Sequence, residues 1–153
     1  MTETAPSNVT IRAAEFSDAA ILASLMGELG YETRTAKMEM RLEVILKDSR
    51  SATLVAVNEG RVCGMIGAQS RYNYEHNGPA GRILALVVTK AMRDRGIGRR
   101  LLAAAEENLA ARNIRRVAVN TRFERKEAHE FYDRMGYERN GFRFFKNLPG
   151  SAD

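Results

Sequence analysis

The sequence has little of what disulfides, metal sites and membrane insertion require. Its single cysteine, Cys63, allows no internal disulfide. With only two histidines besides, no zinc-site spacing is present, so we expect no metal. The longest apolar run, residues 83–88, is far shorter than the ~20 residues that span a bilayer, and the first residues lack the basic-then-apolar pattern of a signal peptide. We therefore expect a cytoplasmic protein with no membrane partner.

Charge of one sign is also not concentrated over a wide surface. The 24 basic and 19 acidic residues are interleaved and leave a net charge of +5. One basic cluster stands out within eleven positions: Lys90, Arg93, Arg95, Arg99 and Arg100. Sites for single-stranded nucleic acid interleave aromatic residues with such cations, whereas here the apolar residues between them are Met92 and Ile97. We therefore expect no nucleic-acid partner, and the cluster needs a second feature before it indicates an anion site.

The length and the order of elements predict one domain of class α/β (α+β) with a central mixed sheet. The 153 residues, 44% apolar and 28% charged, can bury a hydrophobic core without disulfide bonds or a structural metal ion. Apolar periodicity predicts strands at residues 9–12, 52–57, 61–70, 83–88, 116–120, 137 and 141–146. It predicts helices at residues 17–29, 35–46, 98–112 and 126–135. Ser17 or Asp18 could cap the first helix, and Gly136 suits a left-handed cap at the end of the last. The apolar stripe of the third helix is Leu101, Leu102, Ala105 and Leu109. The run 83–88 is expected to be a central strand buried on both faces.

The second feature is a loop with two glycines between the strand 83–88 and the helix that follows. The first turn of a helix has unpaired N–H groups and the positive end of the helix dipole. Gly96 and Gly98 would let the backbone approach an anion, which favours a pyrophosphate site with arginines around it. The spacing is neither the dinucleotide G-x-G-x-x-G nor a P-loop, and a tight helix cap with solvated arginines would have the same sequence.

A later segment narrows the choice: Arg125-Lys-Glu-Ala-His-Glu-Phe-Tyr132-Asp-Arg-Met-Gly136-Tyr137. Together the two segments resemble the GNAT N-acetyltransferases, whose motifs read Q/R-x-x-G-x-G/A and A-x-x-F-Y-x-x-x-G-F/Y. The resemblance spans residues 9–148 and implies a single GNAT domain over residues 4–148 with a tail at 149–153. The hairpin ending 64–67 and the segment 137–146 look like small bacterial enzymes related to aminoalkylphosphonate N-acetyltransferases.

The resemblance implies acetyl-CoA as co-substrate and assigns roles residue by residue. The strand end would pair with the pantetheine arm, the loop would cradle the pyrophosphate, and Tyr132 would protonate the departing thiolate. The implied cofactor-binding residues are Leu86, Val87, Val88, Arg93, Asp94, Arg95, Gly96, Ile97, Gly98, Arg99, Asn120 and Arg125. Tyr132 could instead be a half-buried packing residue beside Phe131.

The general base is left open, because the strand 83–88 contains no acid where many relatives carry a glutamate. The residues that we expect near the acceptor, some of them candidate bases, are Glu28, Tyr31, Tyr74, Glu75 and His76. The predicted function is acetyl transfer to the primary amine of a small molecule by direct attack. The alternatives are a protein or peptide N-acetyltransferase and a non-catalytic acyl-CoA-binding regulatory module. A homodimer is left open.

Overall fold

The computed structural model describes residues 8–121 and 125–150. The chain divides into two compact units, which meet in sequence at Val119 and Asn120. Within the described residues, the first unit holds five strands and three α-helices, and the second holds one α-helix. No helix in the described part of the chain is long and apolar enough to cross a membrane.

The first unit is built on a five-stranded mixed sheet, which confirms the predicted fold class. The strands follow the order β1-β2-β3-β4-β5, with antiparallel neighbours except for the parallel pair β4 and β5. They are β1 (Val9–Ala13), β2 (Ser51–Asn58), β3 (Arg61–Arg71), β4 (Ala80–Val88) and β5 (Val117–Val119). The turn between β2 and β3 has positive φ at Glu59 and Gly60, as the two-residue hairpin turn requires.

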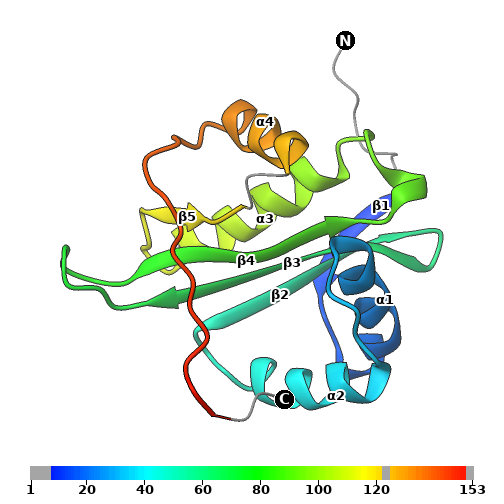
Figure 1. Ribbon diagram of the computed structural model, residues 1–153. Coiled ribbons are helices and arrows are strands. Elements are labelled where there is room, and N and C mark those ends of the chain that lie inside the picture. Colours follow the sequence, from blue (N-terminus) through cyan, green and yellow to red (C-terminus); the bar gives the residue numbers. More distant parts are fainter. Residues whose placement is uncertain (1–7, 122–124, 151–153) are drawn as a thin grey trace. The chain divides into compact units, whose positions relative to one another are not determined.

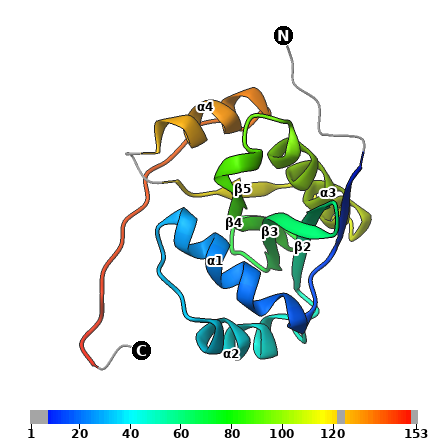
Figure 2. The same cartoon turned by 90° about the vertical axis from the view of Figure 1, so that its right-hand side faces the viewer.

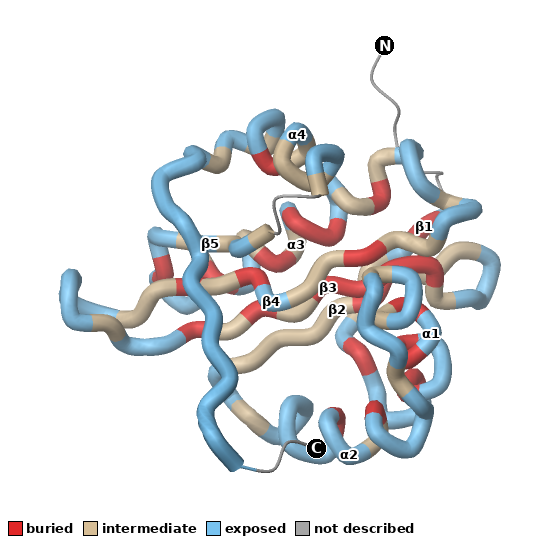
Figure 3. Tube along the Cα trace, viewed as in Figure 1, coloured by how far each residue is buried: buried red, intermediate tan, exposed pale blue. Residues whose placement is uncertain are grey.

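Helices cover both faces of this sheet. The helices α1 (Ala19–Leu29) and α2 (Thr35–Ile45) lie on one face, and α3 (Ile97–Ala111) lies on the other (Figures 1 and 2). The strand centres and the inner helix faces are the buried parts of the trace (Figure 3). The predicted apolar stripe of α3 is fully buried, and Ile97 at the start of the helix is buried with it; the stripe consists of Leu101, Leu102, Ala105 and Leu109.

The approach of α3 to β4 depends on one small residue. A Cβ atom added at Gly81 would lie 2.8 Å from Leu109 Cδ1, closer than real Cβ contacts. On the opposite face, Leu22 and Leu25 of α1 pack in a cluster with Met65 of β3 and Val87 of β4. The helices are therefore fixed against β4, whose C-terminal end leads into the glycine loop.

Two local expectations require correction. Residues 137 and 141–146, predicted as strand material, form neither helix nor strand, and Phe142, Phe144 and Phe145 are 72–92% exposed. Alternating apolar residues form a strand only where a neighbouring strand accepts their hydrogen bonds. Asp18, a candidate helix cap, makes no side-chain bond to the α1 amides. Its carboxylate pairs with Arg12 at 2.8 Å, and this bond lowers the pKa of Asp18.

Candidate functional site

The two halves of β4 have different neighbours. Residues Gly81–Ile83 pair with β5, and no residue of β4 beyond Ile83 does so among the described residues. The register with β3 shifts at the same place, since Gly67 faces Ala85 while Ala68 faces Ile83. Leu84 is thus a bulge residue, and it is 56% exposed. A bulge bends and twists its strand, so β4 parts from β5 here, and the expected burial on both faces does not hold.

The direction of the free backbone groups follows from the register. Thr89 N–H donates to the Cys63 carbonyl at 2.8 Å, which makes these two residues a hydrogen-bonded pair of the antiparallel ladder. Because such pairs alternate, Ala85 and Val87 bond to β3, while Leu86 and Val88 turn their N–H and C=O groups to the other edge. Within the part of the chain that the structure describes, β4 therefore presents an open edge beyond the bulge, which can add an extended, amide-bearing ligand as a further strand.

The open edge leads into an anion-binding helix terminus. After β4 comes the short 3₁₀ helix η2 (Lys90–Met92), then Gly96, which is left-handed with φ 78° and forms the N-cap of α3. No side chain of residues 8–121 or 125–150 caps α3. The amides of its first turn, from Ile97 to Arg99, therefore lack a side-chain partner, and together with the helix dipole they suit a phosphate group. This places the predicted loop directly at the end of the open edge.

The loop is held by side chains from within the first unit. Arg93 Nε donates to the Val88 carbonyl at 2.9 Å, and Arg93 Nη2 lies 3.5 Å from Glu28 Oε1. The other contacts of Glu28 are also to this loop: the Thr89 hydroxyl donates to Oε2 and the Lys90 N–H donates to Oε1, both at 2.8 Å. Two donors of Arg93 are thus used inside the protein, and three of its five N–H groups are left over for a ligand.

The remaining loop residues predicted to bind the cofactor point their polar groups to solvent. Asp94, with φ 63°, Arg95 and Arg99 are all exposed. Arg100, their neighbour in the basic cluster, instead donates to the Val9 carbonyl at 2.6 Å and ties α3 to β1. The cluster thus separates into one residue that joins helix and strand and several that surround the end of the helix.

The second unit contains the predicted proton donor on α4 (Lys126–Arg134). Tyr132 is buried, and its ring meets Phe131 and Tyr137 edge-on at centroid distances of 5.2 and 5.5 Å. Burial raises the pKa of Tyr132 to about 12, so its hydroxyl keeps its proton at any physiological pH. Gly136 follows the helix with φ 90°, the left-handed residue that the sequence predicts at its end.

Glu75 and His76 lie at the other end of β4. They are exposed residues of the loop before Ala80, and both backbone N–H groups bond to the Asn73 side chain. Ala80 and Leu86 are six residues apart, which is roughly 20 Å at about 3.3 Å per strand residue. The structure thus brings Glu28 to the open end of β4, whereas the loop that carries Glu75 and His76 joins the closed end.

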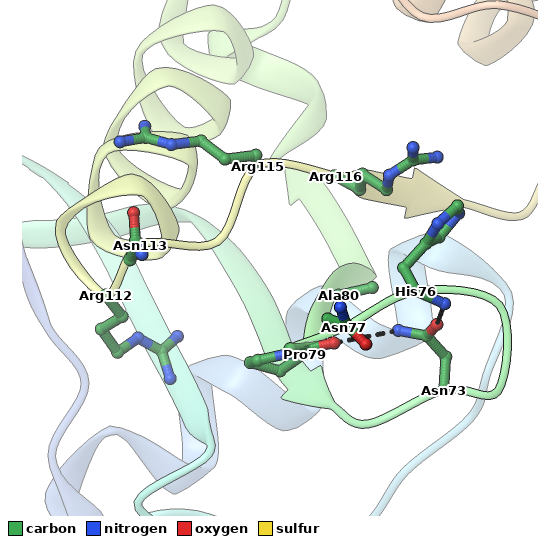
Figure 4. Close-up of a pocket in the computed structure, with 10 residues that line it drawn as sticks. Asn73, His76, Asn77, Pro79, Ala80, Arg112, Asn113, Arg115 and Arg116 are labelled. Carbon is green, nitrogen blue, oxygen red and sulfur yellow. Dashed lines mark hydrogen bonds between the residues drawn. The ribbon is translucent and has the colours of Figure 1, made fainter.

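His76 lines a cavity of about 250 Å³ between this loop and the start of β5, together with Arg112, Arg115 and Arg116. The close-up shows Arg115 and Arg116 pointing in opposite directions (Figure 4). Their guanidinium groups therefore do not converge on one ligand position. Tyr74 in the same loop, Tyr31 after α1 and Asn120 after β5 are exposed, and Arg125 precedes α4.

Two features of the site have no local signature in the sequence. The bulge at Leu84 lies inside an uninterrupted apolar run, and Glu28 is 61 residues before Thr89. The nearest sequence signal is the threonine that follows the apolar run, since its hydroxyl is a donor at a strand end. Among the described residues, no three carboxylate, thiol or imidazole side chains gather in a group that could hold a metal ion.

Comparison with known proteins now gives the family. The model of the acetyltransferase (GNAT) family matches residues 19–137. An aminoalkylphosphonate N-acetyltransferase of Salmonella typhimurium is 38% identical over 94 residues, which span 61% of each chain. An uncharacterized N-acetyltransferase of Bacillus subtilis, YhdJ, is 30% identical over 82% of this chain and 86% of its own.

Solved structures share the fold. A GNAT family acetyltransferase of Staphylococcus aureus superposes with a TM-score of 0.79 at 29% identity, over 92% of this chain and 99% of its own. The aminoglycoside N-acetyltransferase AAC(6')-Iy, solved in complex with CoA, reaches a TM-score of 0.84 at 20% identity, over 94% of this chain and 96% of its own. At that lower identity the likeness shows the fold alone.

Proposed function

This chain belongs to the GNAT acetyltransferase family, and we propose that it transfers the acetyl group of acetyl-CoA to the primary amine of a small molecule. The family and its named relatives make it an N-acetyltransferase. The donor, the acceptor class and the role of each residue are our proposal. The observation that carries it is the open edge of β4 at Leu86 and Val88, continuous with the uncapped start of α3.

Acetyl-CoA fits these two features in order along its length. Its pantetheine arm contains two amides, which can pair with the outward N–H and C=O groups of Leu86 and with the N–H of Val88. The Val88 carbonyl already accepts from Arg93, so it is not needed. The diphosphate would then meet the first-turn amides of α3, with Arg95 and Arg99 adding charge. The thioester lies beyond the amides of the arm, so its carbonyl would lie toward the bulge at Leu84.

The acceptor amine must lose a proton before it can attack. At the lysine reference pKa of ~10.4, about one amine in 2,500 is neutral at pH 7, which costs about 4–5 kcal/mol in available nucleophile. Glu28 is a poor candidate for the base because both of its oxygens already accept hydrogen bonds from the loop. We propose that the amine binds in its neutral form or passes its proton to water, and then attacks the thioester carbonyl directly.

Tyr132 would act at the leaving thiolate. A thiol has a reference pKa of ~8.5, so full proton transfer from a tyrosine at about 12 is uphill by about 5 kcal/mol. The hydroxyl therefore stabilises the developing thiolate chiefly as a hydrogen-bond donor, and the proton moves fully only if binding lowers the pKa of Tyr132. This role depends on the match of α4 to the family motif.

The acceptor class is supported by the relatives rather than by the pocket. The Salmonella relative carries aminoalkylphosphonate in its name, and AAC(6')-Iy carries aminoglycoside. Both are small molecules with primary amines, which favours that class over peptides. The missing carboxylate in β4 is the one feature that favours the rival reading, a module that binds acyl-CoA without turnover.

A thiol-release assay with acetyl-CoA separates these readings. The panel contains aminoalkylphosphonates, aminoglycosides, polyamines and peptides with free N-termini. We expect release with at least one small amine and none with the peptides. Release with peptides alone would favour a protein acetyltransferase, and acetyl-CoA binding without release across the panel would favour the binding module.

A further inference from the structure

Glu28 connects two segments that are far apart in sequence. Its Oε2 accepts the Thr89 hydroxyl at 2.8 Å, its Oε1 accepts the Lys90 N–H at 2.8 Å, and Arg93 Nη2 lies 3.5 Å from Oε1. All three partners belong to the loop between the open edge of β4 and the start of α3. One carboxylate thus joins the C-terminal end of α1 to the segment that we propose to receive the diphosphate.

The position of this carboxylate is unusual for a helix. Glu28 lies in the last turn of α1, which ends at Gly30 with φ 108°. Negative charge is disfavoured there, because the helix dipole places its negative end at the C-terminus. The preceding residues Leu22 and Leu25 are buried in the core, so α1 is a fixed support. A carboxylate against the dipole therefore needs a compensating partner, and the hydroxyl, amide and guanidinium of the loop supply it.

The contacts act on the backbone that leads into the site. The Lys90 N–H begins η2, and the Arg93 side chain returns to the Val88 carbonyl at 2.9 Å. Binding weakens when a loop must be ordered at the moment the ligand arrives. A loop that is already held by Glu28 avoids this entropic cost.

We propose that Glu28 is a positioning residue, which orders Thr89, Lys90 and Arg93 so that acetyl-CoA meets a preformed loop. The inference rests on the proposed function. It gives Glu28 a role in affinity for the donor and none at the reacting atoms. The effect of its loss therefore falls on KM and Kd for acetyl-CoA, while kcat at saturating acetyl-CoA stays within about twofold.

The first test compares Glu28→Ala and Glu28→Gln with the wild type. We expect Glu28→Ala to raise the Kd for acetyl-CoA about tenfold, and Glu28→Gln, which keeps one acceptor oxygen, to raise it about threefold. Glu43→Ala, which removes an exposed carboxylate from α2, is the matched control and should leave Kd unchanged. A fall in kcat that recovers at high pH would instead identify Glu28 as a base and overturn the positioning role.

A second variant keeps the test decisive if Glu28→Ala folds poorly. Thr89→Val removes the hydroxyl donor and should raise Kd by about threefold. In the double variant with Glu28→Ala, the rise in Kd should be smaller than the product of the two single effects, because both substitutions remove the bond between the Thr89 hydroxyl and Glu28. Independent, multiplicative effects would contradict the shared contact.

Amide hydrogen exchange at Lys90 tests the contact without activity. Its N–H donates to Glu28 in the free protein, so exchange should be several-fold faster in Glu28→Ala than in the wild type. The same rate in both proteins would overturn the inference. The two proposals fail separately: a wild type that does not bind acetyl-CoA overturns the proposed function, whereas a binding wild type with an unchanged Kd in Glu28→Ala overturns only the positioning role.

Discussion

The two halves of β4 differ in what lies beside them, and the wholly apolar half is not the half that is paired with strands on both sides. The half from Ala80 to Ile83 has β3 on one side and β5 on the other, whereas among the described residues the half from Leu84 to Val88 has a strand on the β3 side alone. The bulge at Leu84 separates them. Composition therefore does not decide which part of an apolar strand is core and which part can bind a ligand; the neighbouring strand does.

The largest expected effect concerns a group that neither half of β4 supplies. Tyr132→Phe removes the proposed hydrogen bond to the thiolate and keeps the ring that packs on Phe131 and Tyr137. Because one preorganised hydrogen-bond donor to a developing anion contributes ~10²–10³-fold, kcat should fall by that factor with little change in acetyl-CoA affinity. Tyr137→Phe is the matched control. A single-turnover rate within threefold of the wild type would make Tyr132 a packing residue.

The next effect tests the open half through its loop. Gly96→Val places a β-branched residue at φ 78°, a strained conformation, and puts a side chain at the proposed diphosphate site. We expect a loss of acetyl-CoA affinity of about 100-fold, measured by calorimetry. Gly78→Val adds the same side chain at φ 79° in the loop before the closed half. If both variants fold and both lose affinity equally, the two ends of β4 are not functionally distinct.

The closed half should respond in stability rather than in binding. Gly81→Ala forces a Cβ to within 2.8 Å of Leu109 Cδ1, and overpacking of this kind costs about 1–3 kcal/mol. Leu84→Ala removes an exposed side chain, so its free energy of unfolding should change by less than about 1 kcal/mol. Denaturant unfolding measures both. A large loss in Leu84→Ala, or none in Gly81→Ala, would reverse the assignment of the halves.

The smallest effect is expected for Glu75→Gln and His76→Gln, because their loop joins the closed half. For both variants kcat/KM should follow the wild-type pH profile, rising about tenfold per pH unit while the acceptor amine deprotonates. Tyr132 adds no descending limb below about pH 11, because its pKa of about 12 keeps it protonated. A selective loss at neutral pH in either variant would restore that residue as the proton relay.

The sequence was sufficient for features with a local pattern. Consecutive residues predict each of the following: the helices near residues 98–112 and 126–135, the hairpin, and the left-handed Gly136. The loop that contains Gly96 was found in the same way. In contrast, the predicted terminal strand at 141–146 requires a partner strand, and nothing within a segment states whether one is present.

The same limit applies inside the site. The sequence predicts that the cofactor pairs with all three of Leu86, Val87 and Val88. In the register between the two strands, the backbone of Val87 bonds to β3, and the backbone groups of Leu86 and Val88 face the other edge. This depends on the register between two strands. Glu28 was expected near the acceptor and instead bonds Thr89 and Lys90, a contact that becomes apparent only when α1 is packed against the sheet.

Hydrogen exchange at the backbone amides of β4 shows whether the open edge receives acetyl-CoA. We expect Leu86 and Val88 to exchange rapidly in the free protein and at least tenfold more slowly when acetyl-CoA is saturating, because their N–H groups then donate to the pantetheine arm. Ala85 and Val87, bonded to β3, should be slow in both states. Unchanged exchange at Leu86 and Val88 in the saturated protein would contradict the account of the open edge as the acetyl-CoA site.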